Sequence, residues 1–189
     1  MDDNANSLGF WRFTTSAYEK EGVQTGVIML QEEHSADVNV LFLCCYVAAT
    51  QRGRLTTEDL RTIEDSIDSW KTNVTQRLRG VRNQIKENRD LSCLRGSNEV
   101  RAKVLSAEIE SERVTQELLE SLFANRAVNA GAPVLADAVF NLSSYLATIS
   151  RALDSAAENA IAALLRATII TEPGEIEAAM RFDPACGEK

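Results

Sequence analysis

The strongest concentration of reactive side chains is a basic ridge in an otherwise acidic chain. Between Lys71 and Arg89 the sequence has six basic residues and one acidic residue, a net charge of +5, whereas the whole chain of 189 residues has a net charge of -8. If this segment is helical, at about 100° per residue, Arg79, Arg82 and Lys86 lie along one flank of an apolar stripe. That stripe consists of Val74, Leu78, Val81 and Ile85. The basic side chains should therefore border the core.

Two carboxylates in a later segment are natural partners for this ridge. In a helix expected from about residue 98 to 125, Glu108 falls within the apolar arc and Glu112 at its edge. An unpaired buried charge is very costly, so both need partners. The ridge and these residues form either a salt-bridge network between helices or a cleft of mixed charge that binds an anionic metabolite or an acidic partner. Burial would raise the pKa of Glu108 and Arg82 would lower it, which leaves the net direction open.

A second polar group lies where the most apolar helix begins. Asp37 and Asn39 precede the run VLFLCCYVAA of a helix expected from about Ala36 to Gln51, and polar groups at the edge of a core must find hydrogen bonds. We expect a structural polar knot that ties the helix ends to Trp11 or Arg12; the alternative is a pair that orients a ligand. His34 and Asp37 would share a face only on one continuous helix, and a break at Ser35 disfavours a metal site or proton relay there.

Common catalytic patterns are absent from the sequence. It contains no G-x-S-x-G, no G-x-x-x-x-G-K, no G-x-G-x-x-G and no H-E-x-x-H, and one histidine excludes multi-histidine metal sites. We therefore assign no catalytic residue and no metal ligand, and the sequence leaves any cofactor unknown. The candidate ligand-binding residues are Trp11, Asp37, Asn39, Arg79, Arg82, Glu108 and Glu112.

The elements that must position these side chains are helices. The first 132 residues contain no proline, and apolar residues recur at helical spacing without sustained two-residue alternation. Because its run is apolar on all sides, the helix from Ala36 belongs in the middle of a bundle. Thr56 and Asp59 predict a capping box at the start of the next helix. We expect an all-α, compact bundle of six to eight helices.

The segment after Pro133 has a different pattern. From Leu135 to Ala167 apolar residues recur at offsets of four and three, and the second half is rich in alanine, which allows close approach between helices. This pattern fits a long C-terminal helix or helix pair that either closes the bundle or forms a homo-oligomer seam. We expect a bundle domain over residues 1–126, this helical segment over 127–171 and a flexible tail over 172–189.

Charge and hydropathy indicate the cellular compartment of the protein and the partners it is expected to have. The N-terminus lacks the pattern of a secretory signal, and the most apolar stretch, Val38–Ala49, is shorter than the roughly 18 to 20 residues that span a bilayer. We expect a cytoplasmic protein without a membrane span. A sequence pI near 4.8 argues against nucleic acid as a partner.

Several short motifs resemble an uncharacterised family of small bacterial all-helical proteins, a domain of unknown function. The resemblance rests on Phe10-Trp11-x-Phe13, Leu30-Gln31, Ala36-Asp37-Val38-Asn39-x-Leu41 and Arg52-Gly53-Arg54-Leu55, and it extends over about residues 8–122. It implies a bacterial cytoplasmic protein but supplies no reaction, cofactor or catalytic residue. The positions that match the family motifs are Trp11, Gln31, Asp37, Asn39, Trp70, Arg79, Arg82, Glu108, Glu112 and Arg113.

These observations favour a non-catalytic binding or protein-interaction module that forms a homo-oligomer. The alternative is a small enzyme or a protein that binds an anionic metabolite in a polar site inside the bundle. In that alternative, Asp37 or Glu108 would be the general base and Arg82 would clamp the anion.

Overall fold

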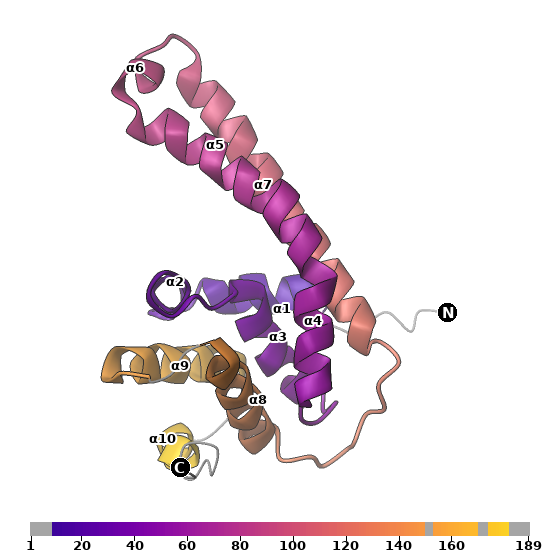
Figure 1. Ribbon diagram of the computed structural model, residues 1–189. Helices are drawn as coiled ribbons and strands as arrows, with labels where there is room; N and C mark the ends of the chain where they lie inside the picture. The colour runs from indigo at the N-terminus through magenta and orange to yellow at the C-terminus, as the bar shows by residue number, and fades with distance from the viewer. Residues whose placement is uncertain (1–8, 150–152, 170–173, 182–189) are drawn as a thin grey trace.

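The computed structural model describes residues 9–149, 153–169 and 174–181, and within these ranges the chain forms helices and no strand (Figure 1). The all-α fold is therefore confirmed. The helices are α1 (Phe10–Tyr18), α2 (Val23–His34), α3 (Val38–Ala49), α4 (Thr57–Trp70), the π-helical turn η1 (Lys71–Thr75), α5 (Gln76–Glu87), α6 (Arg89–Ser92), α7 (Ser97–Phe123), α8 (Val134–Ile149), α9 (Ser155–Thr168) and α10 (Glu175–Arg181).

Helix α3 is the centre of the body of the molecule. Every residue from Asn39 to Ala48 is buried, including the free thiols of Cys44 and Cys45. Helices α1, α2, α7, α8 and α9 all pack against it, as the apolar character of its whole circumference predicts. The start of α3 is thereby held firmly among several other helices, and this is where Asp37 and Asn39 lie.

The C-terminal heptad pattern forms a pair of helices. Helix α8 packs mainly on α3 and α9 mainly on α2, and the Asp154 side chain caps α9 by accepting a hydrogen bond from the backbone N–H of Ala157. Val139, Leu142 and Leu146 of the seam are buried in the core of their own chain. These positions consequently do not offer the exposed apolar surface that an oligomer seam would need.

Small residues bring α2 and α9 unusually close together. A Cβ atom placed on Gly26 would lie 3.0 Å from the Cβ of Ala160 and 3.1 Å from its Cα. The close approach expected from the alanine-rich sequence is therefore real, and its partner is a glycine of α2.

A helical arm projects from this body (Figure 1). Helices α4, η1 and α5 follow one another without a break, and α5 runs beside α7 to a tip that contains α6. The stripe expected to be core is only partly covered, because a single helix faces it: no residue of α5 is buried, and Val81 is 45% exposed. We call residues 76–103 the arm.

Several local predictions can be compared with the structure. The capping box of Thr56 and Asp59 is present. Within the range predicted to be a flexible tail, residues 175–181 form α10, and Ile176 is buried; residues 170–173 and 182–189 lie outside the described residues. No described helix combines the length and apolar character needed to cross a membrane.

Candidate functional site

The basic ridge and the two glutamates form an ion-pair cluster at the base of the arm. Arg79 Nε donates to Glu108 Oε1 at 2.9 Å, and Arg79 Nη2 donates to Glu112 Oε1 at 2.8 Å. Arg82 Nε donates to Glu108 Oε2 at 2.5 Å. The predicted salt-bridge network between helices is therefore present, and it joins α5 to α7.

The two carboxylates of this cluster differ in their electrostatics. Burial raises the pKa of Glu108, but hydrogen bonds from Arg82 and Arg79 outweigh it, so the pKa is lowered. Burial also raises the pKa of Glu112, and there the hydrogen bond from Asn39 and the charge of Arg79 do not compensate, so the pKa is raised. Glu108 is thus held as an anion, which makes it a poor general base.

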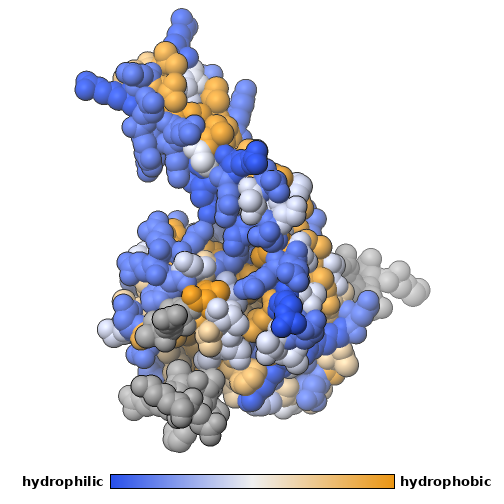
Figure 2. Space-filling view, viewed as in Figure 1, coloured by the Kyte–Doolittle hydropathy of each residue, from blue (hydrophilic) through white to orange (hydrophobic). Residues whose placement is uncertain are grey.

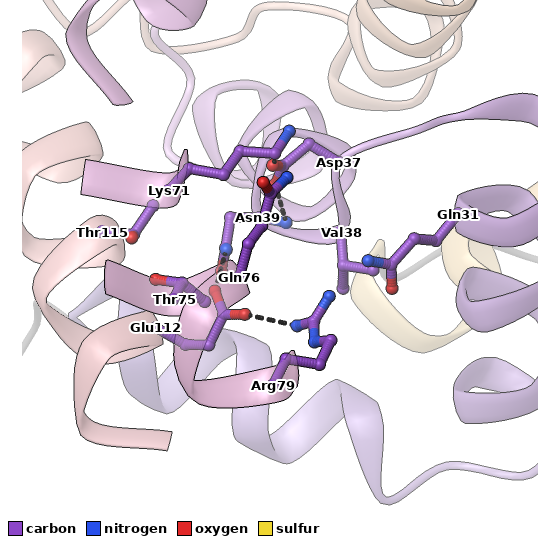
Figure 3. A pocket seen from close by; sticks show the side chains of 10 residues that line it. All are labelled: Gln31, Asp37, Val38, Asn39, Lys71, Thr75, Gln76, Arg79, Glu112 and Thr115. Atoms are coloured by element: carbon purple, nitrogen blue, oxygen red, sulfur yellow. Dashed lines mark hydrogen bonds and ion pairs between the residues drawn. The ribbon is translucent and has the colours of Figure 1, made fainter. Parts of the chain in front are cut away.

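A polar chain continues from Glu112 into the body. Asn39 Nδ2 donates to Glu112 Oε2 at 2.6 Å, and Gln116 Nε2 donates to Asn39 Oδ1 at 2.8 Å. Figure 3 shows Asn39, Glu112 and Arg79 converging from α3, α7 and α5. The directions of these two hydrogen bonds follow from the Glu112 carboxylate, which can only accept. It accepts from the amide nitrogen of Asn39, so the amide oxygen of Asn39 is left to accept from Gln116.

Asp37 belongs to the same end of α3 but has different partners. Its carboxylate accepts from the backbone N–H of Asn39 at 2.9 Å and pairs with Lys71 Nζ at 2.7 Å, while its backbone N–H donates to Tyr145 Oη at 2.7 Å. A polar knot is present, as expected, but the partners of Asp37 and Asn39 were predicted wrongly. Groups on η1, α7 and α8 take the place expected for Trp11 or Arg12, because those helices surround the start of α3.

A groove of about 420 Å³ opens beside this cluster. Its apolar lining includes Trp11 and Tyr18 of α1 and Leu105 and Ile109 of α7, and both α7 residues are exposed. Asn39, Arg79, Glu108, Glu112 and Gln116 supply polar lining. Apolar walls with a few converging polar groups are typical of small-molecule sites of this size.

Two buried polar atoms of the groove's lining residues have no hydrogen-bond partner. They are the Thr14 hydroxyl oxygen and Gln116 Oε1, in residues that are only 6% and 3% exposed. Buried polar groups are almost always satisfied, and leaving one unsatisfied costs about 1–3 kcal/mol. The protein's own contacts therefore leave these two atoms unsatisfied, in residues that line the groove.

The charges of the groove favour a neutral or cationic molecule. Glu19, Glu108 and Glu112 line it against one cation, Arg79, which is already paired with both of the latter carboxylates. Tyr18 is the phenol of the lining, and burial raises its pKa, so it is not activated as a nucleophile. The arrangement is therefore better suited to holding a molecule than to reacting with it.

The structure brings most of the predicted site residues together. The groove is lined by five of them, Trp11, Asn39, Arg79, Glu108 and Glu112. Arg82 does not line the groove but pairs with Glu108, which does. Asp37 lines a smaller adjoining cavity together with Asn39, Arg79 and Glu112. Sequence reasoning missed Thr14, Tyr18, Leu105, Ile109 and Gln116. A signal existed for Gln116, because it follows Glu108 and Glu112 at four-residue intervals on one helix face.

The region around His34 is arranged differently from a continuous helix. Ser35, at φ 60°, ends α2, and Asp37 then caps α3, so the predicted break is confirmed. Ligand atoms of Glu33, His34 and Asp154 lie within 4.8 Å of one another, but Asp154 already caps α9 and the two acidic residues are exposed. We assign no metal to this group.

The fold and site together define an all-α protein with a polar cluster and a ligand-sized groove at the base of a helical arm. Residues 9–119 match the family model described as "Protein of unknown function (DUF2390)", so the chain belongs to that family. This agrees with the resemblance to an uncharacterised family. Neither the curated proteins nor the solved structures include a match to the chain.

Proposed function

We propose that this protein is a non-catalytic binding protein whose groove between α1, α3 and α7 holds a small amphipathic molecule. The single observation that carries the proposal is the pair of buried, unpartnered polar atoms, on Thr14 and Gln116, in residues of a groove whose lining combines aromatic and aliphatic side chains with polar and charged ones. The compartment implied by the sequence resemblance is the bacterial cytoplasm.

The ligand class follows from the lining. An apolar portion would contact Trp11, Tyr18, Leu105 and Ile109. A hydrogen-bond donor would bind Gln116 Oε1 once the side chains that cover this buried atom move aside. The excess of carboxylates disfavours an anion, in contrast to the anionic metabolite considered from the sequence. An amine, alcohol or amide attached to a compact apolar group meets all of these requirements.

Binding is preferred to catalysis for electrostatic reasons. A general base needs an accessible carboxylate oxygen and a pKa near the working pH, yet two arginines occupy both oxygens of Glu108 and lower its pKa. The same pairing engages Arg82, which the enzyme hypothesis needs as an anion clamp.

A charge-matched series of probes tests this proposal. Benzylamine, benzyl alcohol and benzoate share a ring but carry a cation, a neutral donor and an anion, and each is titrated into ¹⁵N-labelled protein while the amide NMR shifts are recorded. We expect benzylamine and benzyl alcohol to shift resonances of α1 and of residues 105–116, with little effect of benzoate. No shift in these helices, or a preference for benzoate, would contradict the proposal.

A further inference from the structure

The smaller cavity beside the groove is lined by two ion pairs. It has a volume of about 50 Å³ and lies where α2, α3, η1, α5 and α7 meet. Lys71 Nζ is 2.7 Å from Asp37 Oδ2, and Arg79 Nη2 is 2.8 Å from Glu112 Oε1. Figure 3 shows these two pairs on opposite sides of Asn39. The described lining of this cavity therefore carries two positive and two negative charges.

The four charged side chains keep hydrogen-bonding capacity that the protein does not use. Lys71 Nζ has three N–H donors, and Asp37 is its one partner among the described residues. Arg79 bonds through Nε and Nη2, which leaves Nη1 without a partner in that part of the chain. Each carboxylate has about four lone-pair sites, and described residues occupy two of them in Asp37 and two in Glu112. The cavity can therefore bond to an added cation and an added anion together.

The cavity and the groove adjoin along a shared boundary. The residues that line both are Gln31, Val38, Asn39, Arg79 and Glu112. The Gln31 side chain forms no hydrogen bond with a residue that the structure describes, and Figure 3 shows its amide directed toward Arg79. Gln31 can therefore move aside without losing a bond, and one molecule can then extend from the groove into the cavity.

The charges of the cavity select the end of the ligand that it accepts. A lone cation would be repelled by Lys71 and Arg79, and a lone anion would be repelled by Asp37 and Glu112. A head group with an ammonium and a carboxylate on one carbon matches both signs, and its net charge of zero agrees with the carboxylate-rich groove. Burial raises the pKa of Glu112 in spite of Arg79, so a ligand ammonium would stabilise that carboxylate.

The size and the surroundings of the cavity fit such a head group. At about 10–15 Å³ for each water, the cavity holds roughly three to five waters, which the few non-hydrogen atoms of the head group would replace. Figure 2 shows mainly hydrophilic residues at the surface where the arm leaves the body, which is the region of η1 and the start of α5. The polar end of a ligand is therefore expected on this side of the groove.

We propose that the ligand is an apolar α-amino acid, with its side chain in the groove and its ammonium and carboxylate groups in the smaller cavity. The ammonium group lies near Asp37 and Glu112, and the carboxylate accepts hydrogen bonds from Lys71 and Arg79. This inference rests on the proposed function and deepens it, because it specifies the head group of the amphipathic molecule.

Three ring-matched ligands separate the head group from the apolar part. L-Phenylalanine, phenethylamine and 3-phenylpropionate share a ring and its chain but carry both charges, a cation and an anion near neutral pH. Each is titrated into ¹⁵N-labelled protein, and the amide NMR shifts give the dissociation constants. We expect L-phenylalanine to bind about tenfold more tightly than phenethylamine, with 3-phenylpropionate weakest, and to shift resonances of residues 71–76 as well as those of α1.

Two variants of the cavity test where the carboxylate binds. Lys71→Gln removes a cation from the lining, and Gln76→Glu adds an anion at an exposed position of it. Both should abolish the tenfold preference for L-phenylalanine over phenethylamine. The matched control is Lys86→Gln, which removes the same charge as Lys71→Gln at an exposed position that lines neither cavity and should keep the preference. Circular dichroism checks that each variant is folded.

The outcomes distinguish this inference from the proposed function. If phenethylamine binds in the groove and L-phenylalanine binds no more tightly, the inference is wrong and the proposed function stands. The inference is also wrong if 3-phenylpropionate binds as tightly as L-phenylalanine, or if both cavity variants keep the preference. If none of the three ligands shifts resonances of α1 or of residues 105–116, the proposed function fails as well.

Discussion

Glu108 and Glu112 lie one helical turn apart, but they should contribute to stability with opposite dependence on pH. The lowered pKa of Glu108 means that its contribution is fully present above its unfolded pKa and is lost as pH falls through the folded value. The raised pKa of Glu112 means that ionisation costs folded-state stability as pH rises from its unfolded value through the folded one.

We predict that Glu108→Gln lowers the free energy of unfolding by about 2 kcal/mol near neutral pH, because Arg82 loses its partner and Arg79 loses one of its two. Chemical denaturation between about pH 7 and pH 4 measures this. The deficit of Glu108→Gln should shrink on acidification, whereas that of Glu112→Gln should be smaller at neutral pH and grow on acidification.

The control is Glu117→Gln, which removes an exposed pair with Arg113 and should change stability by less than about 0.5 kcal/mol. Equal effects of Glu108→Gln and Glu117→Gln would show that the cluster is not a buried network.

Thr14 is a residue whose stability and binding roles should conflict. Thr14→Val removes an unpartnered buried hydroxyl with little change of shape and should raise the free energy of unfolding by about 1 kcal/mol. Thr115→Val is the matched control, because the Thr115 hydroxyl donates to the Ser111 carbonyl at 3.2 Å and its loss should not stabilise. Thermal and urea unfolding of both variants would decide; a destabilised Thr14→Val would mean that the hydroxyl is satisfied.

Among individual residues, the ionic part of the site was predictable from the sequence. A carboxylate on an apolar arc must pair, and the ridge was the nearest source of cations, so Glu108 with Arg79 and Arg82 followed from charge and helical periodicity. The partners of Asp37 and Asn39 did not follow, because they come from η1, α7 and α8, and no local pattern specifies which helix ends meet.

Two helical glycines lie in different surroundings, one in a close contact between helices and the other on an open helix surface. Gly26 faces Ala160 at a distance that a methyl group would crowd, whereas a Cβ on Gly80 of α5 would meet nothing within 4 Å. Helix propensity alone would make both alanine substitutions favourable by up to about 1 kcal/mol.

Gly26→Ala should therefore destabilise the protein by about 1–2 kcal/mol, since α2 and α9 must separate. Gly80→Ala should stabilise it by up to about 1 kcal/mol. Differential scanning calorimetry of the pair gives the comparison directly, and stabilisation by both substitutions would refute the close packing of α2 on α9.

The sequence predicted which segments are helical, but it did not predict how many other helices pack against each one. The all-round apolar run of α3 specified a central helix, and periodicity specified α5 and α7. The stripe from Val74 to Ile85 resembled core because periodicity reports which face is apolar and does not report how many helices cover it. In the arm only α7 does so, and Val81 stays exposed.

In the molecule as a whole, a body centred on α3 carries both the groove between α1, α3 and α7 and a charged arm. The groove is made by α1, α3 and α7, which are far apart in the sequence, so its volume and its unpartnered atoms could not be read from spacing. The heptad pattern after Pro133 likewise did not tell what its apolar residues pack against, because the same pattern serves oligomerisation or closure of the bundle. Here α8 packs on α3 and α9 packs on α2.

If the groove is a binding site, Thr14 and Gln116 keep polar atoms free for its ligand. The most direct measurement is the dissociation constant of benzylamine for wild type, Thr14→Val and Thr115→Val, obtained by NMR titration. We predict that Thr14→Val binds about fivefold more weakly although it is the more stable protein, and that Thr115→Val binds as wild type does. Equal or tighter binding by Thr14→Val would contradict this role of the groove.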